Sequence, residues 1–273
     1  MVHITAEQKE RFLHEGYLVV ENVVGQPERE AAIDAIEAFL GVDADDPDTW
    51  YKHRLEGHGI VPLHHAQALW DLRQLPPIHD IYAQMYGDER LWVTFDRVSF
   101  KAPGRGWQDP VSMNPVHWDC DPRTWRQLSI QGLVYLRDTD AAQGAFCCVP
   151  RIYQNLPEWL AAHAEDADVR RPDVSGERMV SVGGPAGSLV MFHRLMPHSS
   201  GPNEGDRPRL VQYVAMNPVG SEDERAQRVS DYQANMPPQW AIRQHVAGQQ
   251  MPEPGAPARL TPLGRKLVGL DPW

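Results

Sequence analysis

Short apolar segments separated by turn residues fill the chain from Leu91 onward. Each segment has the length of a β-strand, and Gly, Pro, Asn or Asp residues stand between successive segments. The segments are LWVTFDRVSF, LSIQGLVYL, GAFCCVP, RMVSV, GSLVMFH and RLVQYVAMN. This spacing is typical of a β-sandwich or barrel, and such folds often reach roughly 200–250 residues as one domain. The sequence therefore predicts a mainly β fold with residues 1–273 in a single domain.

Helices are expected before and between these strands. Thr5 and Gln8 have the spacing of a capping box, Gly16 is suited to end the helix, and YLVVENV follows as a strand. A second helix is expected from Pro27 to Gly41, with apolar residues at helical spacing. Weaker helical patterns occur at EWLAAHAE and at DERAQRVSDYQANM. These helices are expected to flank the sheets.

The interval 42–75 begins with the acidic stretch VDADDPDTW and shows no clear period. We expect a long loop with one short helix there. Long irregular segments are often lids or binding loops, although mobile surface is an equally good explanation. The region 42–90 and the tail 218–273, helical or irregular, are therefore interpreted as an insertion and a lid that shape substrate access.

The composition limits which classes of molecule this protein is expected to bind and where in the cell it is expected to occur. The formal charge is −11, which opposes general attraction to nucleic acid or anionic lipid. Three cysteines, two of them adjacent, do not make a disulfide framework, which favours a reducing compartment. The start MVHITAEQKERF lacks the apolar stretch of a signal peptide, and no run of about 18 apolar residues occurs. We expect a cytoplasmic protein without a membrane or nucleic-acid partner.

The segment PVHWDCD places His117 and Asp119 two residues apart near the start of the strand-rich half. On a strand, residues two apart share one face, so an imidazole and a carboxylate can bind one metal ion. A second histidine from a distant strand would complete a two-His, one-carboxylate triad with open positions, which suggests Fe(II). A single His-x-Asp pair occurs by chance about once in a chain of this composition, so the context decides.

That context comes from HRLMPHSSGPNEGDRPRL. His198 follows the strand GSLVMF, and Arg209, eleven residues later, opens the strand RLVQYV, where a guanidinium can bind a carboxylate in a two-pronged manner. His193 is a rival third ligand, but no arginine stands at the same offset from it. Arg207 is a rival for the role of Arg209.

These residues resemble those of the phytanoyl-CoA dioxygenase family of Fe(II)- and 2-oxoglutarate-dependent oxygenases. ITAEQKERFLHEGYLVVENVV resembles the opening helix and strand of that family, and QLSIQGLVYLRDTDAAQGAFCCVPRIYQ resembles its central strand pair. The resemblance spans roughly residues 4–217. It departs from the family at VPRIYQ, where a PGSH-like sequence is usual, and that departure concerns the edge of the pocket.

The resemblance implies a double-stranded β-helix, a jelly-roll of the cupin type, with Fe(II), 2-oxoglutarate and O₂ as cofactor and cosubstrates. The implied iron ligands, which are also the catalytic residues, are His117, Asp119 and His198. In the resemblance Arg209 binds the distal carboxylate of 2-oxoglutarate, and Ser200 assists with its hydroxyl.

Strand parity adds further candidates. If the strand 128–136 directs its odd-numbered residues inward, polar side chains line the cavity and can contact 2-oxoglutarate. These side chains are Ser129, Gln131 and Tyr135. The same parity on VSFKAPG aims Arg97 and Lys101 inward, toward an anionic substrate or the cosubstrate, although solvated edge charges explain them equally well.

The implied reaction is hydroxylation of an unactivated C–H bond of a small-molecule substrate, with release of succinate and CO₂. Halogenating relatives replace the carboxylate ligand by a small residue, so Asp119 favours hydroxylation. Desaturation, epimerisation and ring formation remain open. Two alternatives are a cupin-type isomerase or hydrolase with zinc or manganese, and a homologue that binds a metal or small molecule without turnover.

Overall fold

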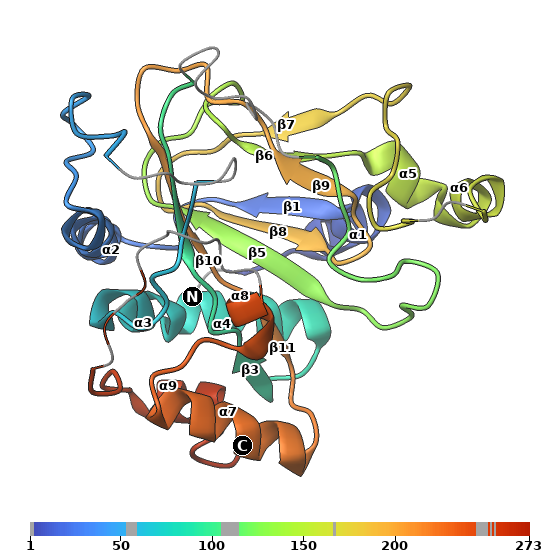
Figure 1. Cartoon of the computed structure of the whole chain (residues 1–273). Coiled ribbons are helices and arrows are strands. Elements are labelled where there is room, and N and C mark those ends of the chain that lie inside the picture. Colours follow the sequence, from blue (N-terminus) through green and yellow to red (C-terminus); the bar gives the residue numbers. More distant parts are fainter. Residues whose placement is uncertain are drawn as a thin grey trace.

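The computed structural model describes residues 3–52, 59–104, 115–165, 168–243, 251, 253 and 255–273. Two antiparallel sheets face each other, and helices cover the outer side of the larger one (Figure 1). The larger sheet has the strand order β1-β8-β5-β10-β4-β2, and β11 pairs with β5 and with β3. The smaller sheet has the order β7-β6-β9. The expected mainly β architecture with flanking helices is therefore present.

The bounds of the strands follow the apolar segments of the sequence. In the larger sheet they are β1 (Tyr17–Val20), β2 (Ile60–Val61), β3 (Leu91–Val93), β4 (Val98–Lys101), β5 (Ile130–Tyr135), β8 (Leu189–His193), β10 (Arg209–Tyr213) and β11 (Met216–Pro218). In the smaller sheet they are β6 (Phe146–Cys148), β7 (Val180–Val182) and β9 (His198–Ser200).

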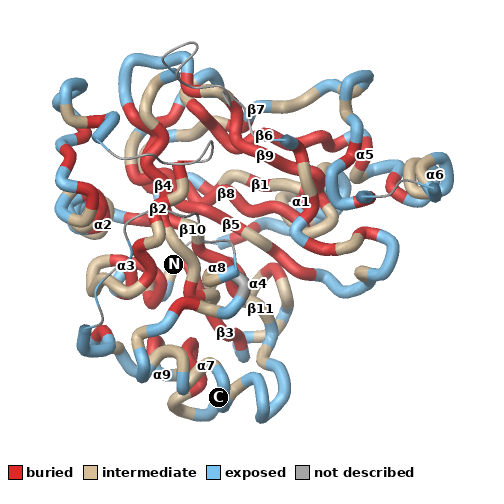
Figure 2. The backbone as a smooth tube through the Cα atoms, in the orientation of Figure 1, coloured by how far each residue is buried: buried red, intermediate tan, exposed pale blue. Residues whose placement is uncertain are grey.

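The space between the sheets is filled by side chains that alternate along the strands. Leu133 and Tyr135 of β5 and Val211 of β10 point inward and meet Phe146 and Val182 from the smaller sheet. The hydroxyl of Tyr135 donates to the carbonyl of Val182 at 2.6 Å, which ties the two sheets together. Both sheets are buried along most of their length (Figure 2). The inward faces thus form one core and, at one end, the site described below.

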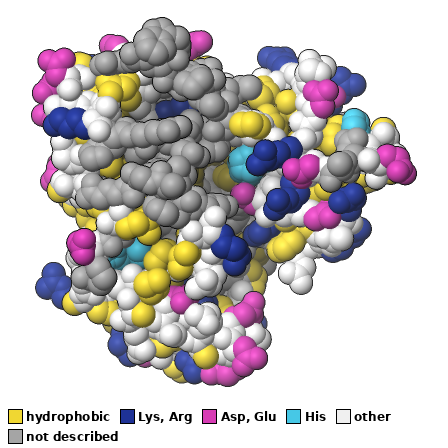
Figure 3. Space-filling view, viewed as in Figure 1, with side chains coloured by type: hydrophobic (Ala, Val, Ile, Leu, Met, Phe, Trp, Pro, Cys, Tyr) yellow, Lys and Arg dark blue, Asp and Glu magenta, His cyan; other side chains and the backbone are white. Residues whose placement is uncertain are grey.

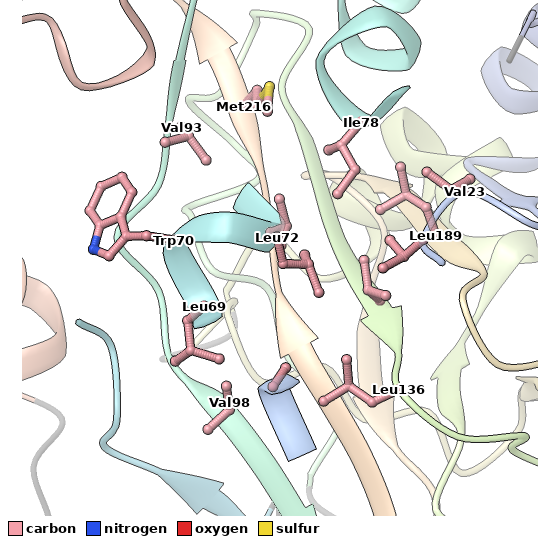
Figure 4. Close-up of a cluster of buried hydrophobic side chains, with 14 of the residues drawn as sticks. Val23, Leu69, Trp70, Leu72, Ile78, Val93, Val98, Leu136, Leu189 and Met216 are labelled. Carbon is pink, nitrogen blue, oxygen red and sulfur yellow. The ribbon is translucent and has the colours of Figure 1, made fainter. Parts of the chain in front are cut away.

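The opposite face of the larger sheet packs against helices. The first four are α1 (Ala6–Glu15), α2 (Gln26–Leu40), α3 (Gln67–Arg73) and α4 (Pro76–Tyr86). Figure 4 shows Leu69 and Leu72 of α3 and Ile78 of α4 against side chains of the sheet such as Leu136 and Leu189. This second core is the largest apolar cluster of the described residues.

The expected helix starts and stops are confirmed. The Thr5 side chain accepts from the main-chain N–H of Gln8, the Gln8 side chain accepts from that of Thr5, and Gly16 ends α1 with a φ of 78°. The second helix ends at Gly41, again at positive φ. A capping box satisfies two main-chain N–H groups that lack a partner inside the helix, and glycine reaches the left-handed conformation without steric cost.

The region expected as an insertion is more ordered than its sequence suggests. Helices α3 and α4 lie within residues 67–86, whereas the sequence predicted a long loop with only one short helix in the interval 42–75. Their apolar side chains, Leu69, Trp70, Leu72, Ile78, Ile81, Tyr82 and Met85, are buried. This part of the region supports the larger sheet, so a role as a lid remains a prediction for the rest of 42–90.

The remaining helices lie after β6. They are α5 (Pro150–Gln154), α6 (Leu156–Ala162), α7 (Glu222–Gln233), α8 (Gln239–Arg243) and α9 (Pro262–Val268). The C-terminal tail joins the main core, because Ala258, Leu267 and Val268 are buried within it. In the described ranges, no helix has both the length and the apolar character needed to cross a bilayer. On the described part of the face in Figure 3, Lys and Arg side chains are interspersed with Asp and Glu.

Candidate metal centre

Two histidines far apart in the sequence meet as a strand pair. The main-chain N–H of His117 donates to the carbonyl of His198, and the N–H of His198 donates back, each at 3.0 Å. Directly opposed residues of an antiparallel pair place their side chains on the same face. The two imidazole rings accordingly lie 4.6 Å apart between centroids.

The carboxylate of Asp119 lies between these rings. Its Oδ1 is 3.6 Å from Nε2 of His117, and its Oδ2 is 3.6 Å from Nε2 of His198. One ligand atom from each residue can be chosen so that all three lie within 4.8 Å of one another. The structure thus brings His117, Asp119 and His198 together, and the rival His193 is outside this group.

Main-chain carbonyls orient both imidazoles. Nδ1 of His117 lies 3.1 Å from the carbonyl oxygen of Pro115, and Nδ1 of His198 lies 3.0 Å from that of Met196. A carbonyl only accepts, so each Nδ1 carries a proton and each Nε2 offers a lone pair toward Asp119. This carbonyl-to-imidazole arrangement is typical of metal-binding histidines.

The protonation states also suit a metal ion. Burial, the main cause, lowers the pKa of His198 to about 4, with a further contribution from His117. Burial, the largest single cause, would raise the pKa of Asp119, but His198, His117, the hydrogen bond from Gln131 and Arg194 together hold that pKa below its ordinary value. Neutral imidazole and ionised carboxylate are the forms that bind metals near neutral pH. The donor set therefore fits a divalent ion such as Fe(II).

Gln131 of β5 contacts this group from the larger sheet. Its side-chain Nε2 donates to Oδ2 of Asp119 at 2.6 Å. Strand parity had placed Gln131 on the inward face, and the structure agrees. The aromatic rings of Phe146 and Phe192 stack 4.5 Å apart, and the ring of Phe192 is 4.7 Å from that of His198. These two side chains give the site an apolar side that the sequence motifs did not indicate.

A second polar cluster occupies the same interior between β10, β4 and β9. Arg209 stands opposite Lys101 in the β10–β4 pair, and both side chains are buried. Arg209 Nη2 donates to the hydroxyl of Ser99 at 2.9 Å. Lys101 Nζ donates to the hydroxyl of Ser200 at 3.2 Å and to the carbonyl of Gly201 at 2.5 Å. Two cations thus lie within one buried region, an arrangement suited to a carboxylate.

The other predicted residues make different contacts. Ser129 donates its hydroxyl to Oδ1 of Asn217 in β11 at 3.0 Å. Tyr135 is buried in the core between the sheets, and burial raises its pKa above the ordinary value. Arg97 forms an ion pair with Asp96 at 3.4 Å. None of these contacts is with the His117–Asp119–His198 group.

Arg194 is a neighbour of the site that the sequence motifs did not single out. Its guanidinium lies over the ring of Trp125 at 4.5 Å, and Nη2 donates to the main-chain carbonyl of Asp119 at 3.4 Å. The rival ligand His193 is engaged elsewhere, because its Nδ1 accepts from the N–H of Leu195. The segment VPRIYQ contributes α5, and the hydroxyl of Tyr153 donates to the carbonyl of Leu13 in α1.

Comparison with known proteins agrees with this geometry. Residues 12–211 match the model of the phytanoyl-CoA dioxygenase (PhyH) family. A putative phytanoyl-CoA dioxygenase of Dictyostelium discoideum is 20% identical over 262 residues, which cover 78% of this chain and 75% of the relative. The family match over residues 12–211 lies within the stretch 4–217 for which the sequence predicted a resemblance.

Solved structures show the same fold. The GlcNAc Inducible Gene 2 protein of Candida albicans has a TM-score of 0.71 at 14% identity, over 98% of this chain and 77% of that chain. The epimerase SnoN, solved in complex with Fe³⁺, alpha-ketoglutarate (2-oxoglutarate) and nogalamycin RO, has a TM-score of 0.57 at 18% identity, over 93% of this chain and 94% of its own. The expected jelly-roll fold is confirmed.

The expected Fe(II) and 2-oxoglutarate agree with two findings. His117, Asp119 and His198 form a group that could hold a metal ion, and SnoN was solved with Fe³⁺ and alpha-ketoglutarate. The family model covers most of the chain, which confirms the expected enzyme class. The chain belongs to the phytanoyl-CoA dioxygenase family and is an enzyme of the dioxygenase class.

Proposed function

We propose that this protein is a non-haem Fe(II)/2-oxoglutarate-dependent dioxygenase that hydroxylates a C–H bond of a small-molecule substrate. The convergence of His117, Asp119 and His198 carries the proposal. Two imidazoles and one carboxylate leave coordination positions for a cosubstrate and O₂. When bound, Fe(II) and 2-oxoglutarate supply oxidation by O₂, in which one oxygen atom enters succinate, CO₂ leaves and the other oxygen atom enters the substrate.

The residues of this chain would bind and orient the reactants. His117 and His198 would bind the metal through Nε2, and the carboxylate of Asp119 would supply the negative ligand. Their orientation by main-chain carbonyls supports this assignment, because pre-set ligands lose little freedom when the metal binds. Phe146 and Phe192 would limit the access of water to the same space.

Arg209 would bind the distal carboxylate of 2-oxoglutarate, with the hydroxyl of Ser200 beside it. Burial of the guanidinium supports this role, because a buried cation gains most from an anionic partner. Lys101 stands opposite Arg209 and holds Ser200 by a hydrogen bond, so it would add a second positive charge to the same end. Arg97, directly before β4, is proposed to contact an anionic group of the substrate or cosubstrate.

An anaerobic visible spectrum tests the proposal directly. Fe(II) is added to the purified protein, followed by 2-oxoglutarate, and the charge-transfer band of the iron–2-oxoglutarate chelate is recorded. We expect the band in the wild type and its loss in Asp119→Ala, whose fold is checked by circular dichroism. Admission of O₂ should then yield succinate. Iron binding without the band would favour a metal-dependent isomerase or hydrolase, and absence of metal binding would refute the metal centre.

A further inference from the structure

The side chain of Gln131, in the larger sheet, reaches the carboxylate of Asp119, which lies on the side of the smaller sheet. Gln131 lies on β5, where it pairs with Phe192 of β8. Asp119 lies two residues after His117, which pairs with His198 of β9. The bond from Gln131 Nε2 to Asp119 Oδ2 is 2.6 Å long and therefore joins the two sheets at the site. Because a carboxylate only accepts, the nitrogen end of the amide must face Asp119.

This bond makes the two oxygens of Asp119 unequal. Each oxygen lies 3.6 Å from one histidine, Oδ1 from Nε2 of His117 and Oδ2 from Nε2 of His198, but Oδ2 also accepts the hydrogen bond of Gln131. We propose that Gln131 is a positioning residue whose hydrogen bond occupies Oδ2, so that Asp119 binds the metal through Oδ1 alone. The proposal rests on the metal centre of the proposed function.

The consequence concerns the number of coordination positions. A carboxylate that binds through one oxygen leaves three positions beside two histidines in an octahedral ion. A carboxylate that chelates through both oxygens would occupy one of the three. The reaction needs two positions for 2-oxoglutarate and one for O₂, so the bond from Gln131 protects the third position.

The amide is also suited to this task by its charge. Arg or Lys in its place would add a full positive charge beside the metal and oppose cation binding. The other end of the amide, Oε1, is buried and has no hydrogen-bond partner among the described residues. A buried acceptor without a partner is costly, so this atom favours a bound donor such as water on the metal or a hydroxyl of the substrate. The carboxylates of 2-oxoglutarate cannot supply that donor.

A matched control exists in the neighbouring strand. Gln212 of β10 is buried, donates Nε2 to the main-chain carbonyl of Leu69 at 2.8 Å, and likewise has a buried Oε1 without a described partner. Its side chain reaches α3 instead of the interior between the sheets. Replacement of either glutamine removes one buried amide from the same sheet, but only Gln131 contacts a proposed metal ligand.

The test compares Gln131→Met with Gln212→Met, since methionine keeps the length of the side chain and removes the donor. Co(II) replaces Fe(II) as an air-stable spectroscopic probe, and its affinity and visible d–d band are measured in the absence of 2-oxoglutarate. We expect Gln131→Met to weaken Co(II) binding about 10- to 100-fold and to change the band. Gln212→Met should retain the affinity and the band of the wild type.

The outcomes separate this inference from the proposed function. If the wild type and Gln131→Met bind Co(II) with the same affinity and spectrum, the metal centre stands and the role of Gln131 is refuted. If both variants weaken binding equally, the effect of Gln131 is structural and the inference is again refuted. If the wild type binds no Co(II), the metal centre itself fails and the inference fails with it.

Discussion

At the scale of single residues, two buried cations have the most direct chemical consequence. They are Arg209 of β10 and Lys101 of β4, which stand opposite each other. Arg209 and Lys101 are both buried, and among their contacts are the hydroxyls of Ser99 and Ser200 and the carbonyl of Gly201. A charge in such a place costs free energy of desolvation, which an anionic ligand offsets on binding. In the proposed function, these two residues would therefore favour an anionic ligand such as 2-oxoglutarate.

Replacement of Arg209 should act on the cosubstrate and leave the metal ligands unchanged. We expect Arg209→Gln to raise the dissociation constant of 2-oxoglutarate about 10- to 100-fold, because a charge-assisted hydrogen bond contributes about 1.5–3 kcal/mol. Co(II) affinity should stay within about twofold of the wild type. Isothermal titration of both ligands measures this.

Arg207 supplies the control for that experiment. It lies two residues before Arg209, but its side chain is exposed and near Asp206. Arg207→Gln should bind 2-oxoglutarate like the wild type. Equal losses in the two variants would show that the assignment of Arg209 is wrong.

The members of the site differ in how far the sequence alone identifies them. His117 and Asp119 stand two apart in one motif, and the family resemblance added His198 and Arg209; the structure brings the first three together. The bond between Gln131 and Asp119 was not predictable, because it depends on how closely two sheets approach. Parity gave only the face on which Gln131 lies.

At the element scale, β5 occupies the middle of the larger sheet and meets β8, β10 and β11. Gly132, next to Gln131, points to the opposite face. A Cβ atom there would overlap the hydroxyl of Tyr82 and lie 2.9 Å from the carbonyl oxygen of Val214. The hydroxyl of Tyr82 itself donates to Val214. Tyr82 of α4 thus packs against the sheet at Gly132, the position of β5 that has no side chain.

Gly132→Ala should consequently destabilise the fold. We expect the free energy of unfolding in urea to fall by about 1–3 kcal/mol, because the methyl group forces Tyr82 and the neighbouring strand apart. Gly176→Ala is the control, since no atom lies within 4 Å of the added Cβ. A stability of Gly132→Ala equal to that of Gly176→Ala would contradict the close packing.

The elements were predictable where their signals are local. The capping box at Thr5 and the glycine at Gly16 defined α1 without knowledge of the rest of the fold. Strand β9 consists of His198, Ser199 and Ser200, which carry no apolar side chain, so only its pairing with β6 identifies it as a strand. Likewise α3 and α4 follow an irregular acidic stretch, and their burial depends on the sheet beneath them.

For the whole molecule, histidines buried in their neutral form make stability depend on pH. Burial, the main cause in each case, lowers the pKa of His64 and of His193 to about 4. Nδ1 of His193 accepts from the N–H of Leu195, and a proton on that nitrogen would break the bond. The unfolded chain binds these protons near the ordinary pKa of about 6.5, whereas the folded chain does not.

The metal-free protein should therefore lose stability as the pH falls from about 6.5 toward 4, and its stability should be greatest above that interval. Urea unfolding at about pH 7 and about pH 5, with a chelator present, measures the change. His193→Gln should reduce the loss by roughly one quarter, because it removes one of four imidazoles whose pKa is lowered, the others being His64, His65 and His198. An undiminished loss in His193→Gln would contradict this account.

The strand pair between His117 and His198 also bears on how the enzyme is made in the cell. A ribosome delivers the chain from its N-terminus, so a nascent chain that ends before His198 holds two of the three proposed ligands and lacks the residue with which His117 pairs. Metal ions in the cell thus find no complete site until the second half of the jelly-roll has emerged and paired with the first. If the proposed ligands are correct, iron would therefore bind late in maturation, after His198 has emerged and paired with His117.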